Sequence, residues 1–176
     1  METRKEKPKV GVSACLVGQF VRYDGGHKLN VPLMARLEEF FTLVPLCPET
    51  GIGLPTPRSP IRLVGTVEKT RAVLADNFNV GYTGPLENYA RMVWSQTGGS
   101  LKGLVLKSRS PSCGVENVEI LAEDGSTVMG KGIFARVFME IAPGVPVAED
   151  SALDKQEILE TFIAQVLNLP PGNKRL

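Results

Sequence analysis

Short apolar runs rich in β-branched residues alternate along this sequence with longer segments in which apolar residues recur at helical spacing. The short runs, each typical of a buried strand, cover residues 9–14, 41–46, 101–107 and 145–148. Helices are predicted after Asn30 and over residues 86–97, 133–141 and 158–167. Such alternation predicts an α/β protein with one open, mainly parallel sheet, right-handed crossovers and helices on both faces.

Several boundaries of these elements can be predicted from local sequence. Asn30 is expected to cap the first long helix and Thr83 the second, which should end before the two glycines at 98 and 99. Residues 47–60 contain four prolines and two glycines, so we expect a shaped loop without a regular element. Residues 61–75 are predicted to form a β-hairpin or an excursion from the main sheet.

The length and charge of the chain limit its organisation and its partners. With 176 residues, 43% of them hydrophobic, we expect a single domain over residues 9–168 between a flexible leader (1–8) and a flexible tail (169–176). Twenty basic and nineteen acidic residues leave a net charge of +1, which gives no strong nucleic-acid signal. No apolar run is long enough to span a membrane, and the charged N-terminus lacks a secretory core. We therefore expect a cytoplasmic protein, monomeric or weakly oligomeric.

The three cysteines of the chain each follow a predicted strand. Cys15, Cys47 and Cys113 lie in loops rich in proline or glycine, and the carboxyl ends of parallel strands meet at one edge of a sheet. A free cysteine is often a small buried hydrophobe, but three that converge favour a site. Three thiolates could bind zinc with His27 as fourth ligand, or an iron-sulfur cluster with one iron left open. Their spacing contains no C-x-x-C pair, so it does not decide between the two.

Four stretches of the sequence together resemble a known family. The stretches VSACLVGQFVRYDGGHK, VPLCPETGIGLPTPR and LKSRSPSCGV resemble the three signature blocks of the thiouracil desulfurases, and GIFARVFMEIAPGVPVAED resembles the C-terminal helix and strand of that family. The resemblance covers residues 9–167. The resemblance implies a Rossmann-like domain with a [4Fe-4S] cluster held by Cys15, Cys47 and Cys113, its fourth iron open. It also implies removal of sulfur from thiolated uracil, as free base or nucleoside, and it leaves His27 outside the cluster. We expect the short, stand-alone form of the family, with residues 9–168 as its iron-sulfur desulfurase domain.

Three further residues are candidates for the chemistry. Glu49 lies two residues after Cys47, where its carboxylate could activate water or protonate a ring nitrogen; the alternative is a solvated loop carboxylate or a helix cap. Ser110 and Ser112 flank Pro111 before Cys113 and could bind the substrate, or bond to the local backbone instead. The resemblance implies a catalytic serine in this motif, and we favour Ser110.

Residues near the first cysteine are candidates for substrate binding. Arg22, Tyr23 and Asp24 could stack on the pyrimidine and bond its polar edge, although a structural role for this turn is equally plausible. Arg58 and Arg109 could attract a phosphate, but loop arginines are mostly solvated or paired with carboxylates. Trp94 lies in the buried stripe of a predicted helix, so we place it in the core.

Two other functional classes compete with the desulfurase. The same cysteines could hold a structural zinc or a redox-sensing cluster in a non-catalytic protein that acts on a partner. A thiol hydrolase with Cys47 or Cys113 as nucleophile is a third class, but with one histidine in the chain its general base is hard to name.

Overall fold

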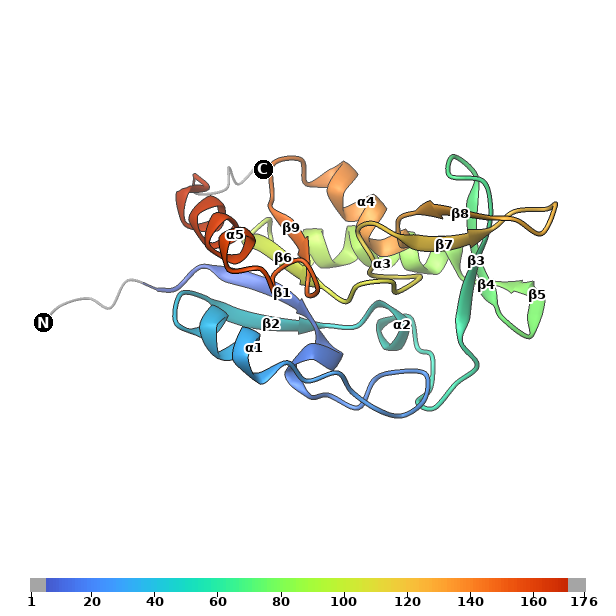
Figure 1. Cartoon of the computed structure of the whole chain (residues 1–176), viewed down its shortest axis with the longest axis horizontal. Coiled ribbons are helices and arrows are strands. Elements are labelled where there is room, and N and C mark those ends of the chain that lie inside the picture. Colours follow the sequence, from blue (N-terminus) through green and yellow to red (C-terminus); the bar gives the residue numbers. More distant parts are fainter. Residues whose placement is uncertain (1–5, 171–176) are drawn as a thin grey trace, which may run out of the picture.

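The computed structural model describes residues 6–170, and these residues form two sheets that lie side by side (Figure 1). The first is a parallel sheet of β1 (Lys9–Ser13), β2 (Thr42–Leu46), β6 (Leu101–Leu106) and β9 (Val147–Glu149), in the order β2-β1-β6-β9. Residues 1–5 and 171–176, which make up most of the predicted flexible leader and tail, lie outside the described residues.

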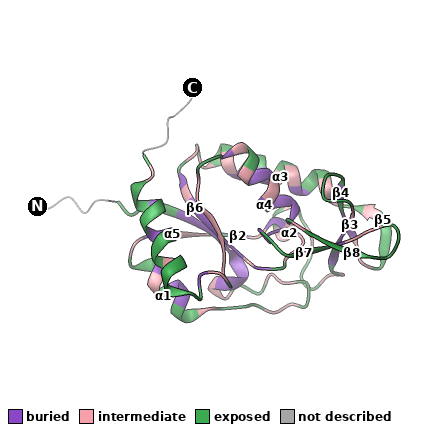
Figure 2. Ribbon diagram, turned by 45° about the horizontal axis from the view of Figure 1, so that its top comes forward, coloured by how far each residue is buried: buried purple, intermediate pink, exposed green. Residues whose placement is uncertain are grey.

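Helices cover both faces of the parallel sheet, as the sequence predicts. On one face, α1 (Val31–Glu38) and α5 (Gln156–Asn168) share a core with β1 and β6, in which Leu37 and Phe162 are buried. On the other face, α3 (Thr83–Gln96) and α4 (Ile133–Ile141) pack on β6 through residues such as Ala90 and Phe138. Figure 2 shows the burial concentrated in the two central strands of this sheet, β1 and β6, whereas the edge strands β2 and β9 are mostly intermediate or exposed.

The order of the parallel strands places a switch point at the middle of the sheet. The chain moves from β1 outward to β2 on one side, and later enters β6 on the other side of β1. The crossovers therefore diverge from the carboxyl ends of β1 and β6, and this divergence opens the crevice in which α/β sheets bind ligands. The loops that follow β1, β2 and β6 all begin at this edge.

The second sheet was not predicted, apart from one hairpin. Residues 61–75 form that hairpin, β3 (Ile61–Gly65) and β4 (Thr70–Leu74), as expected. It is extended by β5 (Asn77–Gly81), β7 (Val118–Leu121) and β8 (Thr127–Gly130) into a mixed sheet ordered β5-β4-β3-β7-β8. Strands β5 and β8 are exposed along nearly their whole length, so they lack the apolar pattern on which the prediction rested.

Helix boundaries were partly predicted correctly. The Asn30 side chain caps α1 by accepting a hydrogen bond from the Leu33 N–H (3.3 Å), as expected. The cap predicted for α3 is wrong, because Tyr82 takes that position while the Thr83 hydroxyl oxygen accepts from the Ala72 N–H (2.9 Å) and ties α3 to β4.

The stretch expected to be a loop without regular structure contains one helical turn. This turn is α2 (Pro48–Gly51), and the prediction is wrong there because Pro48 suits the first position of a helix. Two short helical segments, η1 (Ala14–Val17) and α2, therefore begin the loops after β1 and β2. None of the described helices is long and apolar enough to cross a membrane.

Candidate functional site

A cavity of about 360 Å³ opens at the carboxyl edge of β1, β2 and β6, and all three cysteines line it. Cys15 lies in η1, Cys47 is the N-cap of α2, and Cys113 lies in the loop after β6. No disulfide joins them, and Cys15 and Cys113 are buried. The convergence expected from the predicted sheet is therefore present, since residues nearly a hundred positions apart meet at one cavity.

Each cysteine is held by the backbone around it. The carbonyl of Cys15 accepts from the Lys28 N–H at 2.8 Å, which closes the loop after β1 on itself. The carbonyl of Cys47 accepts from the Gly51 N–H at 2.8 Å, so the sulfur stands at the first turn of α2. These positions depend on backbone hydrogen bonds, which restrict the motion of the side chains they carry.

The loop that carries Cys113 rests on the N-terminal end of α4. The N–H groups of Gly132, Ile133 and Phe134 donate to carbonyls of residues 111–114, at 2.8, 3.1 and 3.0 Å. A helix leaves its first N–H groups without internal partners, and here the cysteine loop supplies the acceptors. A Cβ at Gly132 would stand 2.5 Å from the carbonyl carbon of Ser112, so this contact requires glycine.

Two carboxylates at the end of β9, those of its last residue Glu149 and of the next residue, Asp150, hold the ends of the same loop. Glu149 accepts from the N–H groups of Val115 (2.7 Å) and Glu116 (3.1 Å), and Asp150 accepts from the N–H of Ser108 (2.7 Å). Sequence reasoning missed both residues. The available signal was their place at the end of the fourth predicted strand, the edge at which the cysteines meet.

The ionisation of the buried thiols reflects their surroundings. Burial raises the pKa of Cys15 to about 11, although the charges of Arg22 and Lys107 oppose the rise and the nearby Cys47 adds to it. Burial also raises the pKa of Cys113, opposed by a hydrogen bond with the Ser13 hydroxyl. Because the charge of a neighbouring thiolate disfavours ionisation of Cys15 and of Cys113, these two need a positive partner to be present as thiolates.

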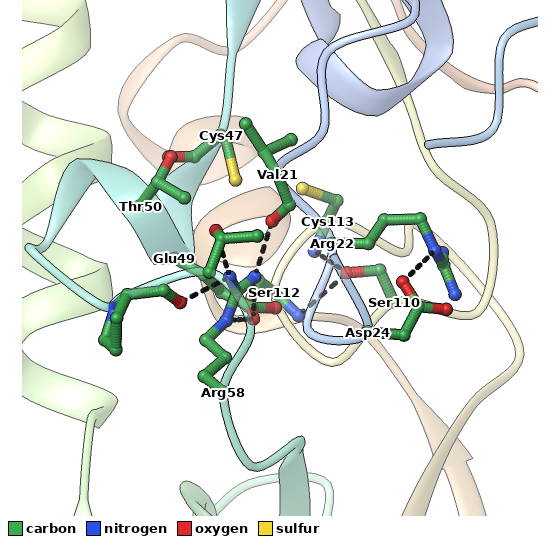
Figure 3. Close-up of polar contacts among 12 residues, drawn as sticks. Val21, Arg22, Asp24, Cys47, Glu49, Thr50, Arg58, Ser110, Ser112 and Cys113 are labelled. Carbon is green, nitrogen blue, oxygen red and sulfur yellow. Dashed lines mark hydrogen bonds and ion pairs between the residues drawn. The ribbon is translucent and has the colours of Figure 1, made fainter. Parts of the chain in front are cut away.

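Glu49 projects from α2 and is held by two side chains (Figure 3). Its Oε2 accepts from Arg58 Nε at 2.8 Å and lies 2.7 Å from Arg58 Nη2, while its Oε1 accepts from the Ser112 hydroxyl at 2.9 Å. The carboxylate lines the cavity together with Cys47, as does Arg58. Arg58 is therefore paired with a carboxylate and not solvated.

The two serines before Cys113 have different positions. Ser110 lines the cavity, and its oxygen accepts from the N–H groups of Cys113 (3.0 Å) and Ser112 (3.3 Å), which leaves its hydroxyl hydrogen free to donate. Ser112 is 1% exposed, does not line the cavity, and uses its hydroxyl hydrogen on Glu49. Only Ser110 is thus placed to contact a molecule in the cavity.

Of the three residues predicted to bind substrate, two line the cavity and one does not. Arg22 and Tyr23 line the cavity, with the Arg22 guanidinium 5.4 Å from the Tyr23 ring centroid and the Arg22 Nε in an ion pair with the Asp24 Oδ1 at 3.5 Å. Asp24 does not line it. The carboxylate of Asp24 accepts from the Gly26 N–H (3.0 Å), and this bond, with the charge of Arg22, lowers the pKa of Asp24. Its position is that of a turn residue.

Three further residues were assigned from sequence with a stated alternative. His27 is not among the residues that line the cavity; its Nδ1 accepts from the Leu29 N–H and its ring packs on Phe20. Trp94 is partly buried and packs edge-on against Phe138 at the margin of the core between α3, α4 and the sheet, so the core placement is confirmed in part. Arg109 lines the cavity and adopts a positive φ of 58°.

The donor set of the cavity can be compared with what a metal group requires. Three cysteines from three separate loops, with Arg22, Lys28 and Lys107 on the same walls, match the sulfur ligands and compensating charge of an iron-sulfur cluster. Within residues 6–170, no group of three or more His, Cys, Asp or Glu side chains is arranged around a single metal ion. The two observations are compatible, because the cysteines of a four-iron cluster each bind a different iron.

Fold and site together define an α/β protein with a cavity lined by cysteines at the switch point of a parallel sheet. Residues 10–150 match the family model of the 2-thiouracil desulfurases, and the chain belongs to this family. The resemblance found in the sequence is thereby confirmed.

The chain is also similar to one curated protein sequence and to one solved structure. The uncharacterized protein YbbK of Bacillus subtilis (strain 168) is 27% identical over 135 residues, which cover 73% of this chain and 88% of YbbK. The solved structure of the [4Fe-4S]-dependent thiouracil desulfidase TudS is 29% identical and superposes with a TM-score of 0.65. That similarity covers 89% of this chain and 99% of TudS.

Proposed function

We propose that this protein removes sulfur from thiolated uracil with a [4Fe-4S] cluster bound by Cys15, Cys47 and Cys113. The observation that carries the proposal is the convergence of three free cysteines and the carboxylate of Glu49 on one cavity. Family membership and the similarity to TudS support it. Residues 9–168 would then form one Rossmann-like desulfurase domain, and the free thiols suit the reducing cytoplasm.

The cofactor is proposed from the donor set. When bound, the cluster would supply an open iron that acts as a Lewis acid and a soft acceptor for sulfur. The basic side chains of Arg22, Lys28 and Lys107 on the cavity wall would offset the negative charge of three thiolates. Residue His27 takes no part in this proposal, since it lies outside the cavity wall.

The reaction replaces a C=S bond by C=O with consumption of one water and release of sulfide. Glu49 is proposed to take the proton from that water or to protonate a ring nitrogen, since a positioned carboxylate can do either. The hydroxyl hydrogen of Ser110 is free to bind the oxygen or the ring edge of the pyrimidine. Tyr23 and Arg22, which stack on each other at the cavity wall, offer a surface for the flat ring.

Two residues of the predicted site are given different roles by this geometry. Ser112 is proposed to hold Glu49 and not to touch the substrate, because it is buried and donates to the carboxylate. Asp24 is proposed to shape the turn that presents Arg22 and Tyr23, because its carboxylate bonds to the Gly26 N–H.

Anaerobic reconstitution with iron and sulfide, followed by incubation with 2-thiouracil or 4-thiouridine, tests the proposal. We expect a brown protein that releases one sulfide for each uracil formed from 2-thiouracil, or for each uridine formed from 4-thiouridine. A protein with a full cluster that released no sulfide from either compound would contradict the enzymatic function and favour a redox sensor. A colourless protein that retained zinc would contradict the cofactor.

A further inference from the structure

Arg58 makes a nearly complete set of polar contacts beside the cavity. Its side chain is 6% exposed, and that of Glu49 is 13% exposed. The guanidinium Nε bonds to Glu49, Nη2 contacts Glu49 (2.7 Å) and bonds to the Val21 carbonyl (2.9 Å), and Nη1 bonds to the Pro55 carbonyl and the Thr56 hydroxyl. An arginine has five N–H donors, and four of them make hydrogen bonds here, while Nη2 also lies within ion-pair distance of Glu49.

Because its hydrogen bonds and its ion pair with Glu49 already occupy nearly all of its donors, Arg58 has little capacity to bind a further group. A phosphate or other anion in the cavity would have to displace one of these contacts, and breaking the contact to Glu49 would leave a mostly buried carboxylate unpaired. Arg58 is therefore not placed as a binding group for an anionic ligand. Its contacts are instead directed at the protein.

The contacts of Arg58 and Glu49 connect all three cysteine loops. Val21 belongs to the loop that follows Cys15, Glu49 and Arg58 follow Cys47, and Ser112 directly precedes Cys113. Figure 3 shows the chain of contacts from the Val21 carbonyl through Arg58 and Glu49. Ser112 completes it by donating to the second oxygen of Glu49 at 2.9 Å. The orientation of the carboxylate is thus fixed from both of its oxygens.

We propose that Arg58 is the positioning residue for Glu49, holding its carboxylate in one orientation at the cavity, with the bond to the Val21 carbonyl fixing the guanidinium itself. The inference rests on the proposed function, in which Glu49 transfers the proton. A lysine cannot reproduce these contacts, because one ammonium lacks the planar fork that reaches Glu49 and Val21 together.

A double-mutant cycle with Glu49 tests this role. In reconstituted protein, Arg58→Met should lower kcat for thiouracil by roughly 30-fold, with KM changed less than about 3-fold, because a misplaced carboxylate affects the proton transfer. Arg58→Lys should recover part of kcat. In a Glu49→Gln background, Arg58→Met should reduce kcat by less than about 3-fold, since the effect of Arg58 on kcat depends on the carboxylate that this background already lacks.

Cluster content separates positioning from assembly. Iron per chain and visible absorbance of Arg58→Met should equal those of wild type, as should those of a matched control, Arg62→Met, whose side chain is exposed on β3. The control should also keep wild-type kcat. If Arg58→Met folds poorly, Arg58→Lys with and without Glu49→Gln provides the same cycle.

Equal losses of kcat from the Arg58 substitution in both backgrounds would overturn the inference, as would a fully loaded Arg58→Met protein with wild-type kcat. A loss of iron in proportion to the loss of activity would also overturn it, because it would make Arg58 an assembly residue. These results presuppose an active wild-type protein. A fully loaded wild type without sulfide release would instead overturn the proposed function and, with it, the role of Arg58.

Discussion

Lys107 and Asp150 form an ion pair that joins the residue after β6 to the residue after β9, with Lys107 Nζ 2.9 Å from Asp150 Oδ2. Both side chains are largely buried, and the Asp150 Oδ1 also accepts from the Ser108 N–H at 2.7 Å. Burial alone would raise the pKa of Asp150, but the hydrogen bonds from Lys107 and Ser108 outweigh it. The pKa of this carboxyl is therefore lowered from its ordinary 3.8.

The ion pair predicts a pH-dependent contribution to stability. A carboxyl whose pKa is lower in the folded state stabilises the fold at pH values above 3.8 and loses that contribution as the pH falls through its folded-state pKa. Asp150→Asn should lower the free energy of unfolding by about 2 kcal/mol at pH 7, the scale of hydrogen bonds to a charged group. The difference from wild type should shrink below the ordinary pKa of aspartate.

Urea unfolding of the cluster-free protein at several pH values measures this difference. Asp154→Asn is a matched control, because Asp154 is exposed and close in the sequence. Its substitution should change stability by less than about 0.5 kcal/mol at every pH. If the free energy of unfolding of Asp150→Asn stayed below that of wild type by the same amount from pH 7 to pH 3, the carboxylate charge would not be the source of the difference.

Cluster binding should require each of the three cysteines. Cys15→Ser, Cys47→Ser and Cys113→Ser should each lose visible absorbance and iron after reconstitution, because a hydroxyl is a poor substitute for a thiolate ligand of iron. His27→Ala should keep both, since His27 does not line the cavity. Iron analysis gives the answer, and retention of about four irons in any of the three serine variants would remove that cysteine from the ligand set.

Glu49 should be needed for turnover and dispensable for assembly. Glu49→Gln keeps the shape of the side chain but cannot transfer a proton, so sulfide release per cluster should fall by roughly 100-fold with iron content unchanged. Ser110→Ala should reduce it less, because a lost hydrogen bond costs less than a lost proton carrier. Glu119→Gln, on the exposed side of β7, should behave as wild type. Wild-type turnover in a fully loaded Glu49→Gln protein would favour an unassisted water.

The strands and helices that have their own apolar pattern could be predicted from the sequence. The strands that exist only because they pair with a neighbouring strand could not. The strands β1, β2 and β6 are short apolar runs between helical stripes, so their alternation gave the parallel sheet and its covered faces. Strands β5 and β8 bury little and depend on their neighbours in the sheet, so their residues carry no such pattern. Propensity is a weak guide where tertiary context decides the structure.

In the candidate site, too, the features set by the topology of the sheet could be predicted, and those set by the folding of the loops could not. That Cys15, Cys47 and Cys113 meet could be inferred, because topology alone brings the carboxyl ends of parallel strands together. The partner of Arg58 could not be named, since it depends on how the loop after α2 folds back. The different positions of Ser110 and Ser112 depend on which hydroxyl faces Glu49, and two serines around one proline look alike in sequence.

The close packing of α4 on the Cys113 loop gives a final prediction, which concerns Gly132. The Cβ of an alanine at Gly132 would stand 2.5 Å from the carbonyl carbon and 2.8 Å from the N of the peptide that joins Ser112 to Cys113, and backbone atoms cannot swing aside as a side chain can. Gly132→Ala should therefore push the loop from the helix, lowering the free energy of unfolding by about 1–3 kcal/mol. It should also reduce iron binding, because Cys113 moves with the loop.

Gly81→Ala is the matched control for this substitution. Its added Cβ would meet only the Ala72 carbonyl oxygen at 3.7 Å, an ordinary contact, so stability should change by less than about 0.5 kcal/mol and iron content not at all. Urea unfolding and iron per chain, measured on both variants, separate the two positions. If Gly132→Ala bound a full cluster with wild-type stability, the loop would have to tolerate displacement, and its close contact with α4 would not be what positions Cys113.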